Sequence, residues 1–318
     1  MTYCQPMLSC RELIKGHPAI LEDRHGLSFT GHTPFPTIID ALNKSGVVML
    51  RGALPPKELR PCRRSFERFA RRLGKRVVPD PTGDEGPSTE WATGEREEGS
   101  WHRPWIVRDR EDAPAAAVIA LLLRSWAWKV VETVCGSTDV VLLLASCAAR
   151  HAIDKELPIG AHQDCKVVSP DIPFSIWVPL HDVVPLRTSG LGFIVPPPSE
   201  MLPTLPHGDI GADYVAERVA GAWTPTYRAG DLTLHTKLSP HFTTGYGTRS
   251  DRYSFEIRAM AWTDAPDQLQ DPAIYVRRRA DGAPVVVQTR CSGDTRAQAF
   301  VAKTALLAAR GLSAGFAW

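Results

Sequence analysis

The sequence predicts a mainly β protein with flanking helices. Between Val140 and Trp262, short apolar runs are separated by Pro and Gly clusters, a pattern typical of an all-β sandwich or barrel. Helical patterns lie on both sides of this region, and 318 residues with 43% hydrophobic content can bury a large core. We expect one elaborated domain, 1–318, with helical support and a lid loop in 1–139, the β core in 140–262, and a hairpin and helix in 263–318.

The N-terminal elements are predicted from turn residues and periodicity. Residues 40–51 indicate a helix end, a turn at Gly46 and a short buried strand. Pro55 and Pro56 open a helix that runs to about Leu73. Its arginines fall on the outer side of an amphipathic helix, which favours a solvated face: Arg60, Arg63, Arg64, Arg68, Arg71 and Arg72. Residues 79–112 lack periodicity and predict a long loop, and a single helix follows over 115–135.

The β region and the tail contain further elements. The apolar runs that predict strands are Val140–Ala145, Phe174–Leu180, Gly192–Val195, Asp231–His235 and Tyr253–Trp262. The tail predicts a hairpin around Asp281-Gly282, then a helix with Asp294 as its N-cap and Gly311 just beyond its end.

Charge and cysteine usage exclude several classes of protein. A formal charge of +2 predicts binding to neither nucleic acid nor an anionic membrane. Seven cysteines without a C-x-x-C pair indicate reduced thiols. The N-terminus lacks the apolar core of a signal peptide, and the apolar run Ala115–Leu123 is too short to span a bilayer. We therefore expect a cytoplasmic protein with a small-molecule partner.

Two His-x-Asp pairs are candidate metal ligands. His207-Gly-Asp209 lies among prolines and glycines and predicts a surface turn. His162-Gln-Asp164 precedes an extended run, Cys165–Ser169, whose alternation would point both side chains to one face and toward one ion. The alternative is that Asp164 only orients His162.

A third ligand from a distant strand would complete two histidines and one carboxylate, the facial triad that leaves open positions on Fe(II). Downstream histidines at 235 and 241 are available. The next strand places Arg252, Ser254, Glu256 and Arg258 on one side and apolar residues on the other, so its polar side is expected to line a cavity.

Six motifs occur in the order found in a known family. They are NKSGVVMLRGALPPKEL, HQD, FSIWVPLHDV, Ser189–Val195 with Pro196–Pro198, GDLTLH and SPHFTT…DRYSFEIR, over about residues 40–262. The ordered set resembles the phytanoyl-CoA dioxygenase family, Fe(II)- and 2-oxoglutarate-dependent oxygenases with a double-stranded β-helix. The resemblance implies three cofactors or co-substrates, Fe(II), 2-oxoglutarate and O2. By position, the iron ligands are His162, Asp164 and His241, Arg252 pairs with the distal carboxylate of 2-oxoglutarate, and Thr243 and Trp177 line its pocket.

The sequence departs from the family pattern and leaves alternatives. Pro196-Pro-Pro-Ser199 replaces the usual Pro-Gly-Ser-His turn. His235 competes with His241 as third ligand, although the spacing from Gly-Asp-Leu favours His241. Arg249 and Arg258 compete with Arg252 for the carboxylate. Cys165 is expected to face away from the ion as a small buried hydrophobe.

The resemblance implies a dioxygenase that hydroxylates, desaturates or otherwise oxidises a C–H bond of a small molecule, of the kind made in secondary metabolism, with succinate and CO2 as co-products. Halogenation is not expected, because related halogenases carry Gly or Ala where Asp164 stands. Two alternatives are a non-catalytic β-helix protein with a binding or regulatory role and another cupin-like metalloenzyme holding Zn or Mn. The substrate, its oxidative outcome and the oligomeric state are not determined by these residues.

The segment 90–110 combines bulky aromatic residues with charge. Its Trp101, His102, Arg103 and Trp105 are candidate substrate contacts. The segment is either a lid that shields the reactive centre or a loop that its tryptophans pin to the core.

Overall fold

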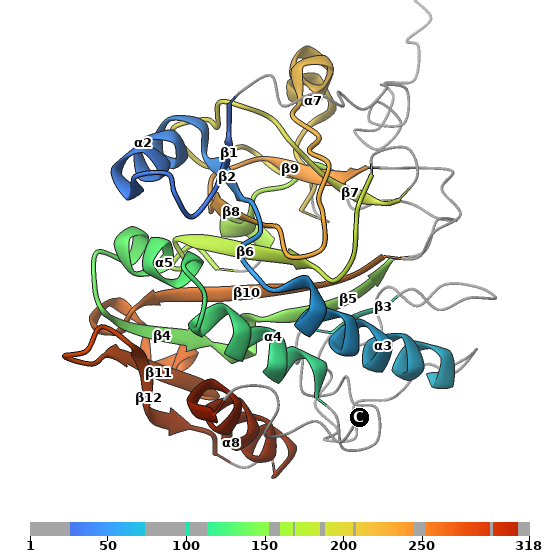
Figure 1. Cartoon of the computed structure of the whole chain (residues 1–318). Coiled ribbons are helices and arrows are strands. Elements are labelled where there is room, and N and C mark those ends of the chain that lie inside the picture. Colours follow the sequence, from blue (N-terminus) through green and yellow to red (C-terminus); the bar gives the residue numbers. More distant parts are fainter. Residues whose placement is uncertain are drawn as a thin grey trace, which may run out of the picture.

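The computed structural model describes residues 26–73, 99–101, 113–152, 160–167, 169–184, 188–205, 208–244, 252–292 and 295–310. These residues form three layers, in which helices cover one face of a large sheet and a small second sheet lies over part of the other face (Figure 1). The predicted mainly β architecture with flanking helices is therefore present.

The large sheet has ten strands in a mixed arrangement. Its main path runs β1-β2-β8-β6-β10-β4-β11-β12, while β5 pairs with β10 and β3 pairs with β5. Only the β1–β2 pair is parallel. The strands are β1 (Ser28–Phe29), β2 (Val47–Leu50), β3 (Gly99–Trp101), β4 (Asp139–Leu143), β5 (Ala148–Ala152), β6 (Phe174–Pro179), β8 (Leu232–Thr236), β10 (Arg252–Ala261), β11 (Ala273–Arg278) and β12 (Pro284–Arg290).

The helical layer packs on the alternate apolar side chains of these strands. Ile176, Leu234 and Phe255 face the helices and belong to one buried core with them. The helices are α2 (Phe35–Ser45), α3 (Pro56–Leu73), α4 (Pro114–Leu123), α5 (Ala127–Cys135) and α8 (Thr295–Arg310). Helix α2 ends where Gly46 adopts the left-handed conformation, with φ 72°, and β2 follows directly. The predicted helix-turn-strand start is confirmed.

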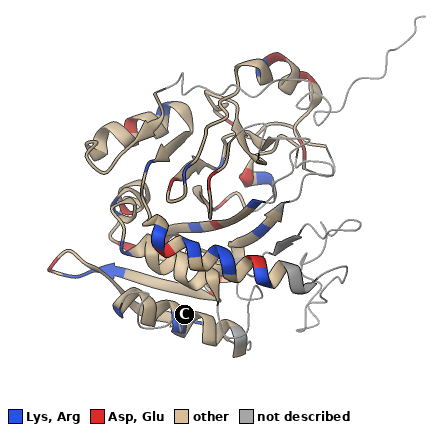
Figure 2. Cartoon of the chain, turned by 45° about the vertical axis from the view of Figure 1, so that its right-hand side comes forward, with Lys and Arg blue, Asp and Glu red and all other residues tan. Residues whose placement is uncertain are grey.

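Helix α3 has the predicted bounds and the predicted charged side. Its apolar residues enter the core, whereas Arg60, Arg63, Arg64 and Arg68 are exposed. Basic residues accordingly mark the outward side of this helix in Figure 2. The side chains of Arg71 and Arg72 are outside the described set.

The single helix predicted over 115–135 is wrong, because the segment forms two helices bent by 80°. Every residue of α4 is buried, and the helix ends at the exposed Arg124, after which the Ser125 hydroxyl donates to the Leu122 carbonyl at 2.8 Å. A straight continuation would have carried the charged Arg124 into the core. Among the described residues, no single helix has the length and apolar character of a membrane span; only the bent pair α4–α5 meets that test, taken together.

The second sheet pairs β7 (Gly190–Phe193) with β9 (His241–Thr244). Between it and the large sheet lies a second apolar cluster, which includes Met49, Trp177, Phe193, Trp223 and Tyr227. Inward-facing residues of the two sheets therefore share one interior, and the polar ones among them build the site described below.

The C-terminal prediction is confirmed by β11, β12 and α8, with Gly282 at φ 83° in the hairpin. Asp294 and Gly311 lie outside the described residues. Strands β1, β3, β5 and β9 and helix α7 (Ala212–Arg218) were not predicted. Strand β5 reads Ala-Ala-Arg-His-Ala, which carries no β-branched residue, and its pairing with β10 and β3 holds it extended.

Candidate metal centre

Polar residues on three adjacent strands form a row on the inner face of the large sheet. Ser175 of β6 lies directly opposite His235 of β8 on one side and Arg258 of β10 on the other. Cross-strand partners project to the same face, so all three side chains point into the space between the sheets. Two residues further along, Thr233, Trp177 and Glu256 form the next inward row.

His162 and His241 are joined through their backbones. Each N–H donates to the other residue's carbonyl at 3.0 Å, as in an isolated antiparallel bridge. The Nδ1 atoms lie 2.9 Å from the Gly160 carbonyl and 3.0 Å from the Ser239 carbonyl. A carbonyl can only accept, so each Nδ1 carries the hydrogen and each Nε2 presents a lone pair.

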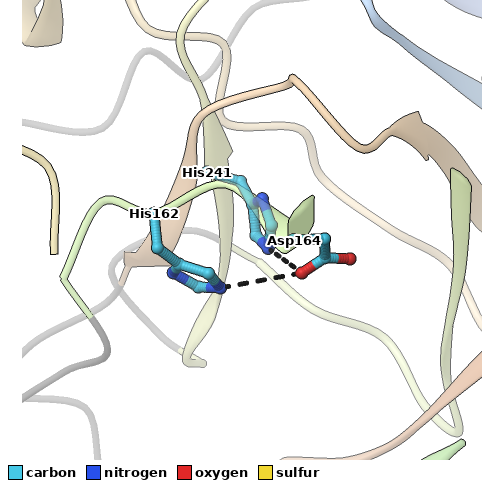
Figure 3. Close-up of side chains that lie close together, drawn as sticks. All are labelled: His162, Asp164 and His241. Atoms are coloured by element: carbon cyan, nitrogen blue, oxygen red, sulfur yellow. Dashed lines mark ion pairs between the residues drawn. The ribbon is translucent and has the colours of Figure 1, made fainter. Parts of the chain in front are cut away.

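Both Nε2 atoms face the same oxygen of Asp164 (Figure 3). The Asp164 Oδ1 atom lies 3.9 Å from His162 Nε2 and 3.7 Å from His241 Nε2, and the three donor atoms lie within 4.8 Å of one another. Ligands bound at about 2.1 Å to one ion are roughly 3–4 Å apart. The structure therefore brings the three predicted ligands together at metal-binding spacing.

The local structure that brings Asp164 there differs from the prediction. An extended run was expected over Cys165–Ser169, but Asp164–Val167 forms the helical turn α6. His162 lies in the bridge to β9 and Asp164 begins the turn. The two side chains therefore reach the same point because the chain changes direction between them, and not because they alternate along one strand. Cys165 is buried and is not part of the ligand group, as expected.

The residue between the two ligands holds the loop in place. Gln163 is fully buried, its Oε1 accepts from the Leu202 N–H at 2.8 Å, and its Nε2 donates to the Leu238 carbonyl at 2.6 Å. The Gln163 amide thus ties the ligand loop to two other segments.

Asp209 of the second His-x-Asp pair also contacts this loop. The predicted turn is present, since the Gly208 N–H donates to the Leu205 carbonyl at 2.8 Å, but Asp209 lies in the interior and not at the surface. Asp209 is buried, the Ile210 N–H donates to the Ala161 carbonyl at 2.7 Å, and Gly160 packs against the Asp209 carboxylate. A Cβ on Gly160 would lie 2.4 Å from Asp209 Oδ2. Segment 208–210 therefore supports the ligand loop; His207 is outside the described residues.

The other oxygen of Asp164 faces the polar row. Ser175 Oγ donates to Oδ2, His235 Nε2 lies 3.5 Å from it, and Arg258 Nη2 lies 3.6 Å from it. Burial favours the protonated form of Asp164, but Arg258, followed by His235 and His241, outweighs burial and holds the pKa of this carboxyl well below its usual value. Asp164 is therefore a carboxylate at neutral pH.

The histidine on β9 is neutral. Burial, followed by the neighbouring His162 and His235, lowers the pKa of His241 to about 3. Neutral imidazole is the form that binds metals. The site therefore presents two imidazole rings, from His162 and His241, and one carboxylate.

The predicted co-substrate residues lie further along the same interior. Arg252 is fully buried on the inward side of β10, with its guanidinium carbon 5.3 Å from the Trp177 ring. Thr243 is two residues after His241 and on the same side of β9. Trp177 Nε1 and Ser254 Oγ are buried without a hydrogen-bond partner in the described part of the chain. Such groups need an acceptor or donor.

Two of the three arginines that are candidates for the co-substrate carboxylate can be compared by position. Arg258 lies beside Asp164, Arg252 lies nearer the start of β10, and Arg249 is outside the described residues. Of the candidate substrate contacts, Trp101 ends β3, whose backbone pairs with Ala149, and its side chain is not described. His102, Arg103 and Trp105 lie outside the described residues, as does most of the 90–110 segment.

One residue of the site was missed from the sequence. Ser175 stands in FSIWVPL as the one hydroxyl in an otherwise apolar strand, and that isolation was the available signal. A lone buried hydroxyl in such a run needs a partner, and Asp164 is that partner.

No protein-family model matches the chain, and no curated protein sequence matches it. Solved structures do. The epimerase SnoN, solved in complex with Fe3+, alpha ketoglutarate and nogalamycin RO, is 18% identical over 82% of this chain and 96% of its own, with a TM-score of 0.51. AviO1 from Streptomyces viridochromogenes Tue57 is 17% identical over 73% of this chain and 97% of its own, with a TM-score of 0.52. The chain therefore shares their fold, the cupin-type double-stranded β-helix, which confirms the predicted fold class.

Proposed function

We propose that the protein is an Fe(II)- and 2-oxoglutarate-dependent oxygenase that oxidises a C–H bond of a small molecule. One observation carries the proposal: two imidazole Nε2 atoms and one carboxylate oxygen converge in a buried space that also contains a buried arginine. Two histidines and one carboxylate leave three positions on an octahedral iron, which a chelating co-substrate and dioxygen require.

The ligand set is His162, Asp164 and His241. Histidines that bind metals ordinarily donate their second ring N–H to a carbonyl or carboxylate. His162 and His241 both do so through Nδ1. The competing His235 makes no hydrogen bond through Nδ1 within the described part of the chain, and its Nε2 lies near the opposite carboxylate oxygen. These contacts support His241 as the third ligand.

The co-substrate pocket is formed by Arg252, Trp177, Thr243 and Ser254. A dicarboxylate needs a cation at its far end, and the buried Arg252 supplies one in a form suited to bidentate pairing. The unpartnered Trp177 Nε1 and Ser254 Oγ offer further donors in the same interior. The residues present therefore fit 2-oxoglutarate.

Bound iron, 2-oxoglutarate and dioxygen supply the oxidising power for C–H cleavage, with succinate and CO2 as co-products. The chain's own residues position these groups and exclude water. Asp164 occupies the coordination position that a halide would need, which supports hydroxylation or desaturation over halogenation. SnoN was solved with a nogalamycin-type small molecule, and we propose a secondary-metabolite substrate by analogy with it.

Two alternatives make different predictions. A non-catalytic binding protein has no need of a buried arginine that pairs with a carboxylate beside a complete set of metal ligands. A zinc enzyme likewise has no need of Arg252. The test is anaerobic addition of Fe(II) and then 2-oxoglutarate to the purified protein. We expect a weak visible charge-transfer band that is absent in His162→Ala, and succinate formation once oxygen is admitted. Tight zinc binding without such a band, or a band unchanged in His162→Ala, would contradict the proposal.

A further inference from the structure

The carboxylate of Asp164 is contacted differently at its two oxygens. Oδ1 faces the Nε2 atoms of His162 and His241, while Oδ2 is contacted by the row formed by Ser175, His235 and Arg258. We propose that this row is an anion cradle, which holds Oδ2 so that Oδ1 stays directed at the two imidazoles. The inference rests on the proposed function, because it assigns the residues that position the carboxylate within that same site.

The sheet itself builds the cradle. The three residues are direct cross-strand partners on β8, β6 and β10, so the backbone register sets their spacing. All three are buried, and the carboxylate is presented to them by the first residue of α6. Residues carried on adjacent strands are held more rigidly than residues on loops.

Arg258 is itself fixed from other directions. Its Nη1 donates to the Ser146 carbonyl, and its Nη2 lies 2.9 Å from Glu256 Oε2 as well as 3.6 Å from Asp164 Oδ2. The guanidinium therefore remains in place whether or not Asp164 is present. Glu256 and Ser146 act as positioning groups for Arg258.

The arrangement has a consequence for the bare site. If the Asp164 side chain is removed, a hydroxyl, an imidazole and a guanidinium still surround the position of Oδ2. Such a position favours a small monoanion with the shape of a carboxylate. Formate is the smallest such anion and can offer its second oxygen to the metal.

The experiment uses the full chain, Co(II) alone as the metal probe, and formate as the anion. In Asp164→Gly, formate should raise Co(II) affinity at least tenfold and restore the Co(II) absorption spectrum toward that of the wild type. Formamide, which is neutral and of the same shape, should have no effect. In Asp164→Gly/Arg258→Met the formate effect should be lost. A formate effect of equal size with and without Arg258, or none in a folded Asp164→Gly, would overturn the cradle.

Single substitutions in the intact chain give a second test that does not require Asp164→Gly to fold. Loss of a group that orients a ligand weakens metal binding about 10–100-fold. Ser175→Ala and His235→Phe should do so and should alter the Co(II) spectrum, whereas Ser175→Thr and His235→Gln, which keep a donor, should restore both. Unchanged affinity and spectra in Ser175→Ala and His235→Phe would refute the cradle while the metal site stands. A wild-type protein that binds no Co(II) would refute the proposed function, and the cradle with it.

Discussion

The backbones of His162 and His241 are paired by two reciprocal hydrogen bonds of 3.0 Å, although the residues belong to distant parts of the chain. This bridge brings the ligand loop to the start of β9 and sets the two imidazole rings 4.2 Å apart between centroids. The metal-binding geometry therefore depends on a backbone contact as well as on the side chains.

Replacing His162, Asp164 or His241 with Ala should remove nearly all bound iron and abolish succinate formation while leaving the fold intact. Each change deletes one ligand of a three-ligand site. Metal content and circular dichroism of each variant check this. His235→Gln is the matched control, because it keeps a donor near Asp164 Oδ2 and should therefore retain metal. Full metal binding in His241→Ala with none in His235→Gln would transfer the third ligand to His235.

Arg252→Ala should raise the apparent KM for 2-oxoglutarate far more than the KM for the small molecule that is oxidised. Losing a charge-assisted bidentate pair to a buried carboxylate costs about 2–4 kcal/mol of binding. Steady-state kinetics with each substrate varied in turn measure the effect, and Arg252→Lys, which keeps the charge without the fork, should lie between. An unchanged KM in Arg252→Ala would move the role to Arg249 or Arg258.

Asp231→Ala should destabilise the fold without specific loss of metal. Its buried carboxylate accepts from Arg51 Nη1, the Gly52 N–H and the Arg228 N–H, each at 2.8 Å. Removing the shared acceptor should lower the free energy of unfolding by about 2–4 kcal/mol, because several donors are left unpaired. Urea unfolding measures this, and Asp231→Asn should lose less. Metal lost from folded Asp231→Ala would show that this aspartate acts on the site itself.

Gly160→Ala should weaken both stability and metal binding. The added Cβ would lie 2.4 Å from Asp209 Oδ2, closer than van der Waals contact allows, so the ligand loop must shift. Co(II) titration and thermal unfolding measure the two effects. In Gly160→Ala/Asp209→Gly the clash is absent, and a positive coupling in the double-mutant cycle is expected. Strict additivity of the two substitutions would contradict the contact.

His181 should make stability fall as the pH drops from about 6.5 to 4. Burial, followed by the positive charge of Arg63, lowers the pKa of His181 to about 4, and its Nε2 accepts the Tyr253 N–H at 3.2 Å. In this range the unfolded chain takes up a proton that the folded chain does not, so acid favours unfolding, by up to roughly 3 kcal/mol. Urea unfolding at several pH values should give a shallower slope for His181→Gln. Parallel curves for the two proteins would exclude His181 as the cause.

Much of the fold could be predicted from the sequence because its signals are local. The alternation of polar and apolar residues in β10, the Gly46 turn and the Pro56 start of α3 each depend on a few neighbouring residues. The break between α4 and α5 could not be predicted in this way, because both halves are apolar enough to continue one helix. Burial of α4 on every side decides where that helix ends.

The candidate site, like the fold, could be predicted from the sequence only in part. The residue types of a metal centre, and the resemblance that picks out His162, Asp164, His241 and Arg252, are contained in the sequence. Only the tertiary structure sets Ser175, His235 and Arg258 side by side. It also brings Asp209 against Gly160 and places Asp164 at the start of the helical turn α6. The physical reason is that strand register and the packing of two sheets join residues far apart in the chain, and no local pattern records which strand becomes the neighbour of which.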